Sequence, residues 1–213
     1  MRTNAGPTTL TRIRRLRRAD LPVDTVALAR FLVGKTLVHD LADGRKHVRL
    51  SGRIVETEAY PVGDPAGHAF RGLTPANRSL FLRRGHAYVY FNYGSCWLMN
   101  VTSEMHGVGG GVLIRAIEPI EGVEQMKRHR GLSRLFDLTR GPGRLAAALQ
   151  IDKHLDGLDL CSPASPLWIG ASPRPAGAIG VSVRIGISRA ARRKLRFYER
   201  GNSFVSGPQW LNK

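Results

Sequence analysis

The stretch KTLVHDLADGRKHVRLSGRIVETEAY, residues 35–60, decides the fold. Its alternating apolar and polar residues, interrupted by Asp43-Gly44, are typical of two or three β-strands joined by a tight turn. Helices are expected over residues 24–34 and 140–151, and a helix or helix pair over 123–137. A hairpin is expected over 87–102, and strands over 110–122 and 178–188. Because no repeat or shift in composition divides the chain, this order predicts a single mixed α+β domain on a mostly antiparallel sheet.

The charge of the chain is strongly one-sided. Among 213 residues, 33 Lys and Arg face 16 Asp and Glu, which gives a net charge of +17. Such a charge favours a polyanionic partner, with nucleic acid as the first candidate and an anionic membrane surface as the second. An Arg-rich composition can also reflect a GC-rich genome.

The chain offers no sign of a membrane segment. No apolar run reaches the roughly 20 residues that span a bilayer, and the N-terminus lacks the apolar core of a signal peptide. Residues 1–20 are predicted to be a flexible basic arm before a domain over residues 21–213. Two cysteines, Cys96 and Cys161, fit a reducing compartment and form no metal pattern.

Two acids alternate in RIVETEAY, residues 53–60. Strand geometry places Ile54, Glu56, Glu58 and Tyr60 on one face, with the two carboxylates about 7 Å apart. The pair is open to two interpretations. It is either a solvated or arginine-paired strand face, or it holds a general base that activates water.

The segment YVYFNYG, residues 88–94, predicts a hairpin with Tyr93 at its tip. Tyr88 and Phe91 are interpreted as ordinary strand packing, but a ring at a tip has little to pack against. Tyr93 could anchor a protein partner or wedge between DNA bases, and the net charge favours the wedge. Tyr60, His68 and Tyr90 are candidate walls of a pocket for a base turned out of the duplex.

Two loop regions add candidate contacts. Residues 61–79 form a long Gly- and Pro-rich loop, a kind that is usually functional. In TRGPGRL the start of a helix could bind phosphate through free N–H groups or could be an ordinary cap. The candidate phosphate ligands are Arg140, Gly141, Gly143 and Arg144. The spacing of Glu58, Asp64 and His68 matches no standard metal site.

Seven segments together resemble the alkyladenine DNA glycosylase family, the mammalian type of 3-methyladenine DNA glycosylase. They are RIVETEAY, H..RG.TP.NR (68–78), YVYFNYG, MNV (99–101), VLIRAIEPIEG (112–122), TRGPGRLAAALQI (139–151) and LRFYERG with VS (195–206). They run in family order over roughly residues 22–206. The resemblance implies a single domain around a curved antiparallel sheet, and not a helix-hairpin-helix glycosylase.

The resemblance also implies a role for each matching residue. Glu58 would activate the attacking water with the help of Arg115, and Glu56 would take no catalytic part. Tyr60 would stack on one face of the extruded base, and His68 and Tyr90 on the other. Asn100 would lie at the pocket floor, and Tyr93 would fill the gap left in the duplex. Ser95 and Leu73 depart from the family pattern.

The implied protein is a monofunctional DNA glycosylase that starts base excision repair. It would flip alkylated or deaminated purines out of double-stranded DNA and hydrolyse the N-glycosidic bond without a metal or other cofactor. We expect a monomer with no membrane partner, intracellular and DNA-associated in a bacterial cytoplasm and nucleoid or a eukaryotic nucleus. The alternatives are a non-catalytic basic DNA-binding protein and a hydrolase of free nucleosides.

Overall fold

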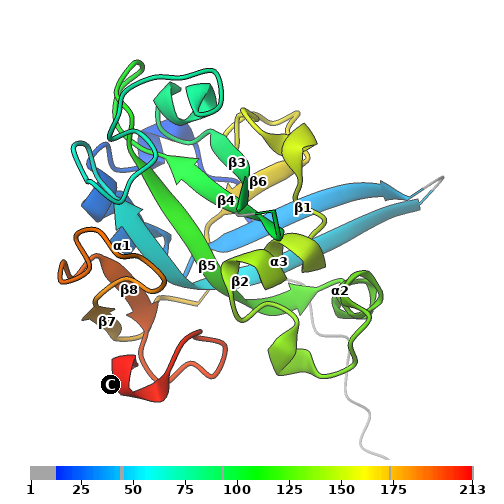
Figure 1. Ribbon diagram of the computed structural model, residues 1–213. Coiled ribbons are helices and arrows are strands. Elements are labelled where there is room, and N and C mark those ends of the chain that lie inside the picture. Colours follow the sequence, from blue (N-terminus) through cyan, green and yellow to red (C-terminus); the bar gives the residue numbers. More distant parts are fainter. Residues whose placement is uncertain (1–12, 44–45, 93, 173, 213) are drawn as a thin grey trace, which may run out of the picture.

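Strand β2 (Lys46–Tyr60) is the longest element and lies at the centre of the sheet. The computed structural model describes residues 13–43, 46–92, 94–172 and 174–212. One edge of β2 pairs with β5 (Gly111–Glu121), and the other pairs first with β1 (Thr36–Asp43) and then with β8 (Arg196–Glu199). Because β1 and β8 share one edge of β2, the sheet divides there and curls around the core (Figure 1).

The described strands form one sheet in which every pairing is antiparallel. The remaining strands are β3 (Ala87–Asn92), β4 (Cys96–Thr102), β6 (Leu167–Gly170) and β7 (Ile179–Ser182). Their order is β3-β4-β5-β2-β1-β6, with β7 outside β8. The predicted α+β fold on a curved antiparallel sheet is therefore confirmed. Asp43 pairs with Lys46 and so belongs to β1, whereas Gly44, the second residue of the predicted turn, lies outside the described residues.

Three α-helices lie within the described ranges. They are α1 (Thr25–Leu32), α2 (Val123–Arg130) and α3 (Pro142–Ala148). Asp24 caps α1 by accepting a hydrogen bond from the Ala27 N–H at 2.7 Å, as expected for an acid at this position. The segment 123–137, predicted as a helix or a helix pair, holds two helical pieces: α2 ends at Arg130, where Gly131 has a φ of 60°, and a short 3-10 helix follows at Leu135–Asp137. No helix in these ranges has both the length and the apolar character needed to cross a membrane.

The main core lies between α1, α3 and the central strands. Leu28, Ala29 and Leu32 of α1 are fully buried in it. The Thr57 hydroxyl donates to the Ala29 carbonyl at 2.9 Å, which ties α1 to β2. The end of β2 that leads into the long loop is thus held by a packed helix.

The predicted basic arm ends earlier than residue 20. Residues 1–12 lie outside the described residues, whereas Leu16 is buried and its N–H donates to the Ile169 carbonyl of β6 at 2.9 Å. The N–H of Ala171 likewise donates to the Arg14 carbonyl at 2.8 Å. Residues 13–20 therefore pack on the sheet edge, because an apolar residue among the arginines reaches the core.

A β-bulge alters the predicted faces of β2. The register against β5 shifts between Ile54 and Glu56 and again after Glu56. Ile54 and Ala59 pack in the main core, while Val55 belongs to a second cluster on the other side. The prediction that Ile54 shares a face with Glu56 was therefore wrong, because a bulge adds a residue and reverses the alternation.

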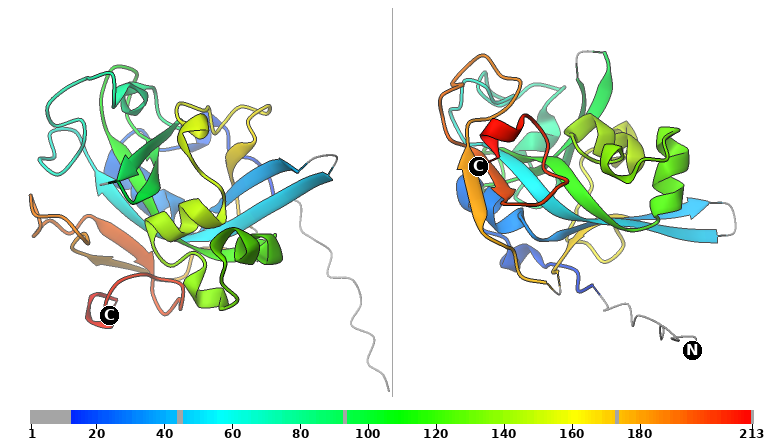
Figure 2. Two further views of the ribbon diagram at one scale, coloured as in Figure 1. Left: turned by 45° about the vertical axis from the view of Figure 1, so that its right-hand side comes forward. Right: turned by 90° about the horizontal axis from the view of Figure 1, so that it is seen from below.

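Two irregular segments complete the end of the molecule that holds the site. Residues 61–77 form the predicted long loop, followed by a short 3-10 helix, Arg78–Phe81. The strand predicted over 178–188 ends at Ser182, and residues 183–188 leave the sheet. The two loops lie side by side (Figure 2), and both contribute to one cavity.

Candidate active site

A cavity of about 280 Å³ lies between the β3–β4 hairpin, β5 and the loops that follow β2 and β7. Its size is at the lower end of small-molecule pockets, which hold about 300–1,000 Å³. Five of the predicted site residues line it: Tyr60, His68, Tyr90, Asn100 and Arg115. These residues are spread over 56 positions of the chain, from 60 to 115, and the sheet brings them together.

The Glu58 carboxylate is fully buried beside this cavity. Tyr60 donates its hydroxyl to Oε2 at 2.9 Å, and the Ile185 backbone N–H donates to Oε1 at 2.7 Å. Arg115 Nη1 lies 3.2 Å from Oε1. All three partners line the cavity. Three convergent donors offset much of the free-energy cost of removing the carboxylate from water.

Glu56 has a different environment two residues earlier. It accepts from Arg196 Nε at 2.6 Å, from Arg115 Nε at 2.9 Å and from the Ser206 N–H at 2.7 Å. Burial alone would raise the pKa of Glu56, but the charges of Arg115 and Arg196 outweigh burial and lower it. Glu56 is thus a buried, arginine-paired acid, as one of the two interpretations of the strand predicted.

Arg115 joins the two acids. Its Nε faces Glu56 and its Nη1 faces Glu58, so one guanidinium spans the alternating carboxylates. Burial works to lower the pKa of Arg115, but Glu58 and Glu56 raise it overall. Arg115 therefore stays a cation with a fixed orientation at the wall of the cavity.

Tyr60, which also lines the cavity, stays protonated. Burial, and then the neighbouring Glu58 carboxylate, raise the pKa of its phenol far above the ordinary value of 10.0. The phenol can therefore act only as a donor to Glu58 near neutral pH. Tyr60 combines an aromatic face toward the cavity with a hydrogen bond to the acid.

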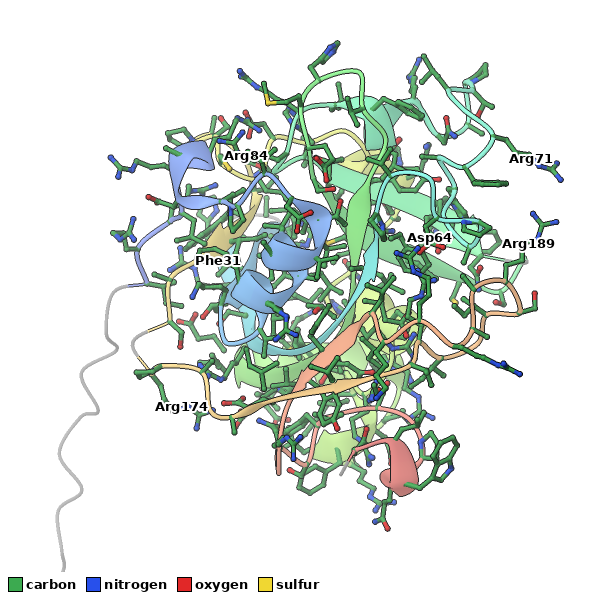
Figure 3. All side chains as sticks on the ribbon, turned by 90° about the vertical axis from the view of Figure 1, so that its left-hand side faces the viewer. Phe31, Asp64, Arg71, Arg84, Arg174 and Arg189 are labelled. Atoms are coloured by element: carbon green, nitrogen blue, oxygen red, sulfur yellow. The ribbon has the colours of Figure 1, made fainter. Side chains whose placement is uncertain are left out.

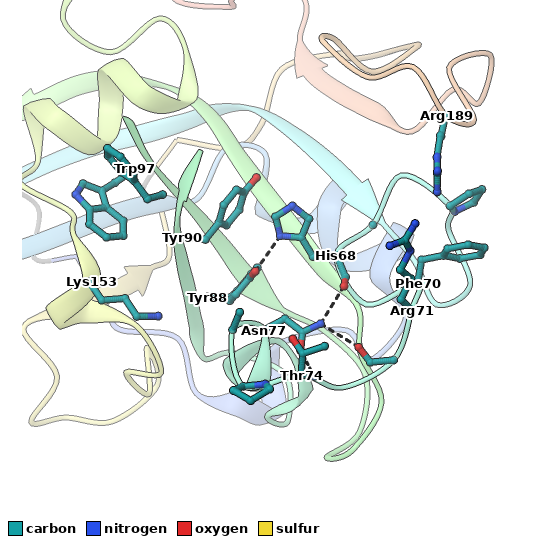
Figure 4. A pocket seen from close by; sticks show the side chains of 16 residues that line it. His68, Phe70, Arg71, Thr74, Asn77, Tyr88, Tyr90, Trp97, Lys153 and Arg189 are labelled. Atoms are coloured by element: carbon teal, nitrogen blue, oxygen red, sulfur yellow. Dashed lines mark hydrogen bonds between the residues drawn. The ribbon is translucent and has the colours of Figure 1, made fainter. Parts of the chain in front are cut away.

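His68, Tyr88 and Tyr90 form the aromatic wall between the cavity and the surface. The His68 and Tyr90 ring centroids lie 4.3 Å apart, and Tyr88 stacks on Tyr90 at 5.3 Å. His68 Nδ1 and the Tyr88 hydroxyl are 2.8 Å apart, and Asn77 Nδ2 donates to the His68 carbonyl at 2.9 Å (Figure 4). Burial lowers the pKa of His68 below 6.5, so the imidazole is neutral at pH 7.

A larger outer groove, of about 1010 Å³, opens on the same aromatic wall (Figure 4). Its apolar lining includes Phe70, Phe91 and Trp97, and the latter two rings lie 4.9 Å apart. Phe91 is 50% exposed, so it is not the buried packing residue that we expected. Arg71 and Arg189 extend outward from the two neighbouring loops (Figure 3).

The predicted phosphate ligands are divided between two places. Gly141, Gly143 and Arg144 line a third cavity, of about 610 Å³, between the hairpin and α3. A Cβ on Gly143 would lie 2.6 Å from Cys96 Sγ, so close packing against β4 is enough to explain this glycine. Arg140 instead donates to the Val205 carbonyl at 3.3 Å and lines a separate cavity beside β8.

Tyr93 lies outside the described residues. Its neighbours place it in the connection between β3 and β4, where Asn92 pairs with Cys96. Gly94, the next residue, has a φ of 67°, a conformation that glycine adopts readily.

Sequence reasoning missed Ile185 and Tyr88. Ile185 acts through its backbone N–H, which carries no residue-specific signal, and it was placed inside a predicted strand. Tyr88 was interpreted as packing, yet its hydroxyl holds His68. Among the residues that the structure describes, no three His, Cys, Asp or Glu side chains gather as a metal site.

Comparison with known proteins places the chain in a family. The family model "Methylpurine-DNA glycosylase (MPG)" matches residues 19–203. A protein of Mesorhizobium japonicum named "Putative 3-methyladenine DNA glycosylase" is 61% identical over 196 residues, 92% of each chain. Proteins with the same name are 53% identical in Paraburkholderia phytofirmans, covering 92% of this chain and 90% of the relative, and 46% identical in Chlorobium phaeobacteroides, covering 86% and 90%.

These matches define a DNA glycosylase, a hydrolase of N-glycosyl bonds that acts in DNA repair. The chain belongs to the methylpurine-DNA glycosylase family. Its substrate is therefore damaged DNA, in keeping with the net charge of +17. The alternative of a non-catalytic DNA-binding protein is set aside, because family membership makes the chain an enzyme.

Proposed function

We propose that this chain flips alkylated or deaminated purines out of duplex DNA and hydrolyses their N-glycosidic bond with a water activated by Glu58. The observation that carries the proposal is the position of the Glu58 carboxylate. It is fully buried, yet its three partners, Tyr60, Arg115 and Ile185, all line the 280 Å³ cavity. A carboxylate in that position can take a proton from a water in the cavity.

The extruded purine would occupy the cavity between aromatic faces. Tyr60 would stack on one face and His68 and Tyr90 on the other, while Asn100 would crowd a purine that carries a 2-amino group. Tyr93 would fill the gap in the duplex. A damaged or poorly paired base costs less to extrude, which contributes to selectivity.

The chemical step uses the residues around Glu58. The water oxygen attacks C1′ as the C1′–N bond breaks, its proton passes to Glu58, and the bonding electron pair leaves with the base. The sugar acquires oxocarbenium character, and a nearby carboxylate stabilises that charge. Arg115 and Ile185 keep Glu58 directed at the cavity. Among the residues that the structure describes, no lysine lines this cavity, and we therefore propose a monofunctional enzyme that leaves an abasic site.

Glu58→Gln tests the proposal most directly. Glutamine keeps the shape of the side chain but cannot accept the proton, so the single-turnover excision rate should fall about 100- to 10,000-fold. Excision is measured on duplexes that each carry one lesion, with alkali applied afterwards to cleave abasic sites. Strand breaks should appear only after alkali, and binding to lesion DNA should persist.

Glu118→Gln is the matched control, because Glu118 is a partly exposed acid paired with Arg174 on the surface. It should excise at the wild-type rate. Wild-type excision by Glu58→Gln would contradict the role of Glu58, and activity on free nucleosides alone would point to a nucleoside hydrolase.

A further inference from the structure

A second fully buried ion pair lies behind the cavity. Arg184 Nη1 donates to Asp64 Oδ2 at 2.6 Å and Nη2 to Oδ1 at 3.1 Å, and both side chains are 0% exposed. Nη1 also donates to the Ala59 carbonyl of β2 at 2.9 Å. The pair thus joins the end of β2, the loop that follows it and the loop that follows β7. Figure 3 marks Asp64 inside the outward-pointing Arg71 and Arg189.

Arg184 contacts two of the three groups that hold Glu58. Its Cζ lies 4.6 Å from the centroid of the Tyr60 ring, and the Tyr60 hydroxyl donates to Glu58 Oε2. Arg184 also directly precedes Ile185, whose N–H donates to Glu58 Oε1. A shift of the guanidinium would therefore move both donors and the stacking face of Tyr60 together.

Asp64 also holds the loop that follows β2. Its Oδ1 accepts from the Ala66 N–H at 2.9 Å, and its carbonyl accepts from the Gly67 N–H at 2.9 Å. These bonds bend the loop just before His68, and both Ala66 and His68 line the cavity. Arg193, half-exposed, adds a longer contact of 3.5 Å to Asp64.

Stability alone does not call for an ion pair at this position. Replacing a buried ion pair by apolar residues of similar volume is often neutral or stabilising. A two-pronged arginine–carboxylate pair does provide orientation, because two parallel hydrogen bonds fix the guanidinium plane. That plane is the one against which the Tyr60 ring packs.

We propose that Arg184 and Asp64 are positioning residues of the reaction, which set the Tyr60 ring and the Ile185 N–H and thereby the direction of Glu58. This inference rests on the proposed function of Glu58. Neither Arg184 nor Asp64 is part of the cavity lining. The two residues affect the rate of the chemical step. They do not affect the affinity for DNA, which depends on residues at the surface.

The test compares Arg184→Met and Arg184→Lys in single-turnover excision over a range of enzyme concentrations, below the melting temperature of each variant. A misplacement of about 1 Å in a catalytic group can cost about 100-fold in rate. We expect the maximal rate of Arg184→Met to fall by about that factor, while the enzyme concentration for half-maximal rate stays unchanged. Arg184→Lys keeps the positive charge but cannot form the two parallel hydrogen bonds. Its maximal rate should lie between those of the wild type and Arg184→Met.

Arg53→Met is the matched control. Arg53 makes a similar two-pronged pair with Glu199 at 3.0 Å and 3.0 Å, its side chain is 3% exposed, and none of its partners lines the cavity. It should lower the melting temperature but keep the maximal rate. Arg184→Met that behaves in the same way would overturn the inference. If the wild type itself does not excise, the proposed function fails instead.

Discussion

At the scale of the residue, Glu56 and Glu58 lie two positions apart in β2 and have different sets of hydrogen-bond partners. All three donors to Glu58 line the cavity, whereas of the three donors to Glu56 only Arg115 does, and Arg196 and the Ser206 N–H are not part of its lining. Arg115 touches both acids. Two carboxylates thus share two guanidinium groups, and this balance of charge offsets part of the cost of burying them.

Replacing Glu56 with Gln should destabilise the fold. It leaves Arg196 and Arg115 short of a negative charge, and breaking a buried ion pair costs about 3–5 kcal/mol. Urea denaturation measures the loss. The exposed Glu118–Arg174 pair is the control, where Glu118→Gln should cost about 0–1 kcal/mol.

The difference in unfolding free energy between the wild type and Glu56→Gln should depend on pH. The pKa of Glu56 is lowered below its ordinary value of 4.5 by folding, so its contribution to stability is complete above pH 4.5. That contribution is lost as the pH falls through the folded pKa. The gap between wild type and Glu56→Gln should therefore narrow in acid, and a gap that stays constant would mean that Glu56 is not ionised.

At the scale of the element, α1 supports the end of β2 that carries Glu58. Asp24 caps it, and the Thr57 hydroxyl bonds the Ala29 carbonyl directly beside Glu58. The bulge at Glu56 sets which side chains of β2 turn toward the cavity. A short helix and one extra strand residue thus prepare the position of the acid.

Asp24→Ala should lower the free energy of unfolding by about 1 kcal/mol, since it removes the cap from the first turn of α1. Asp24→Asn keeps an acceptor oxygen and should recover most of the stability. Thermal unfolding of both variants gives the comparison. Equal losses in the two would show that the charge, and not the hydrogen bond to the Ala27 N–H, is what matters.

At the scale of the whole molecule, the cavities and the charge belong together. The 280 Å³ cavity, the outer groove and the third cavity lie around the β3–β4 hairpin. Arg71 and Arg189 lie at the groove, and Arg130 and Arg144 line the third cavity. A net charge of +17 draws DNA toward the molecule, and these positions put cations on either side of the hairpin.

Arg144→Gln tests whether the third cavity holds a phosphate. A lost phosphate contact should reduce the slope of log K against log salt by about 0.9. Arg174→Gln is the control. Arg174 is exposed and paired with an acid, as Arg144 is, but it is not among the residues that line the third cavity. Figure 3 places Arg174 far from Arg71 and Arg189. Equal slopes in both variants would contradict a local phosphate contact.

Much of the fold was readable from local pattern. Alternation along residues 35–60 predicts antiparallel strands, and Asp24 followed by an apolar run predicts α1, because both depend on neighbouring residues. The bulge at Glu56 was not readable, since it arises where β2 meets β5, more than 50 residues later in the chain. The packing of Leu16 on β6 was missed for the same reason.

By itself the sequence determined the kinds of residue at the site: an acid at 58, aromatic residues at 60, 68 and 90, an arginine at 115 and an excess of positive charge. Folding brought the partners of Glu58 to the cavity wall, set the Ile185 N–H against its carboxylate, and joined Arg184 to Asp64 across 120 residues. The physical reason is that a side chain's chemistry is local, whereas burial and hydrogen-bond partners depend on segments that only folding brings together.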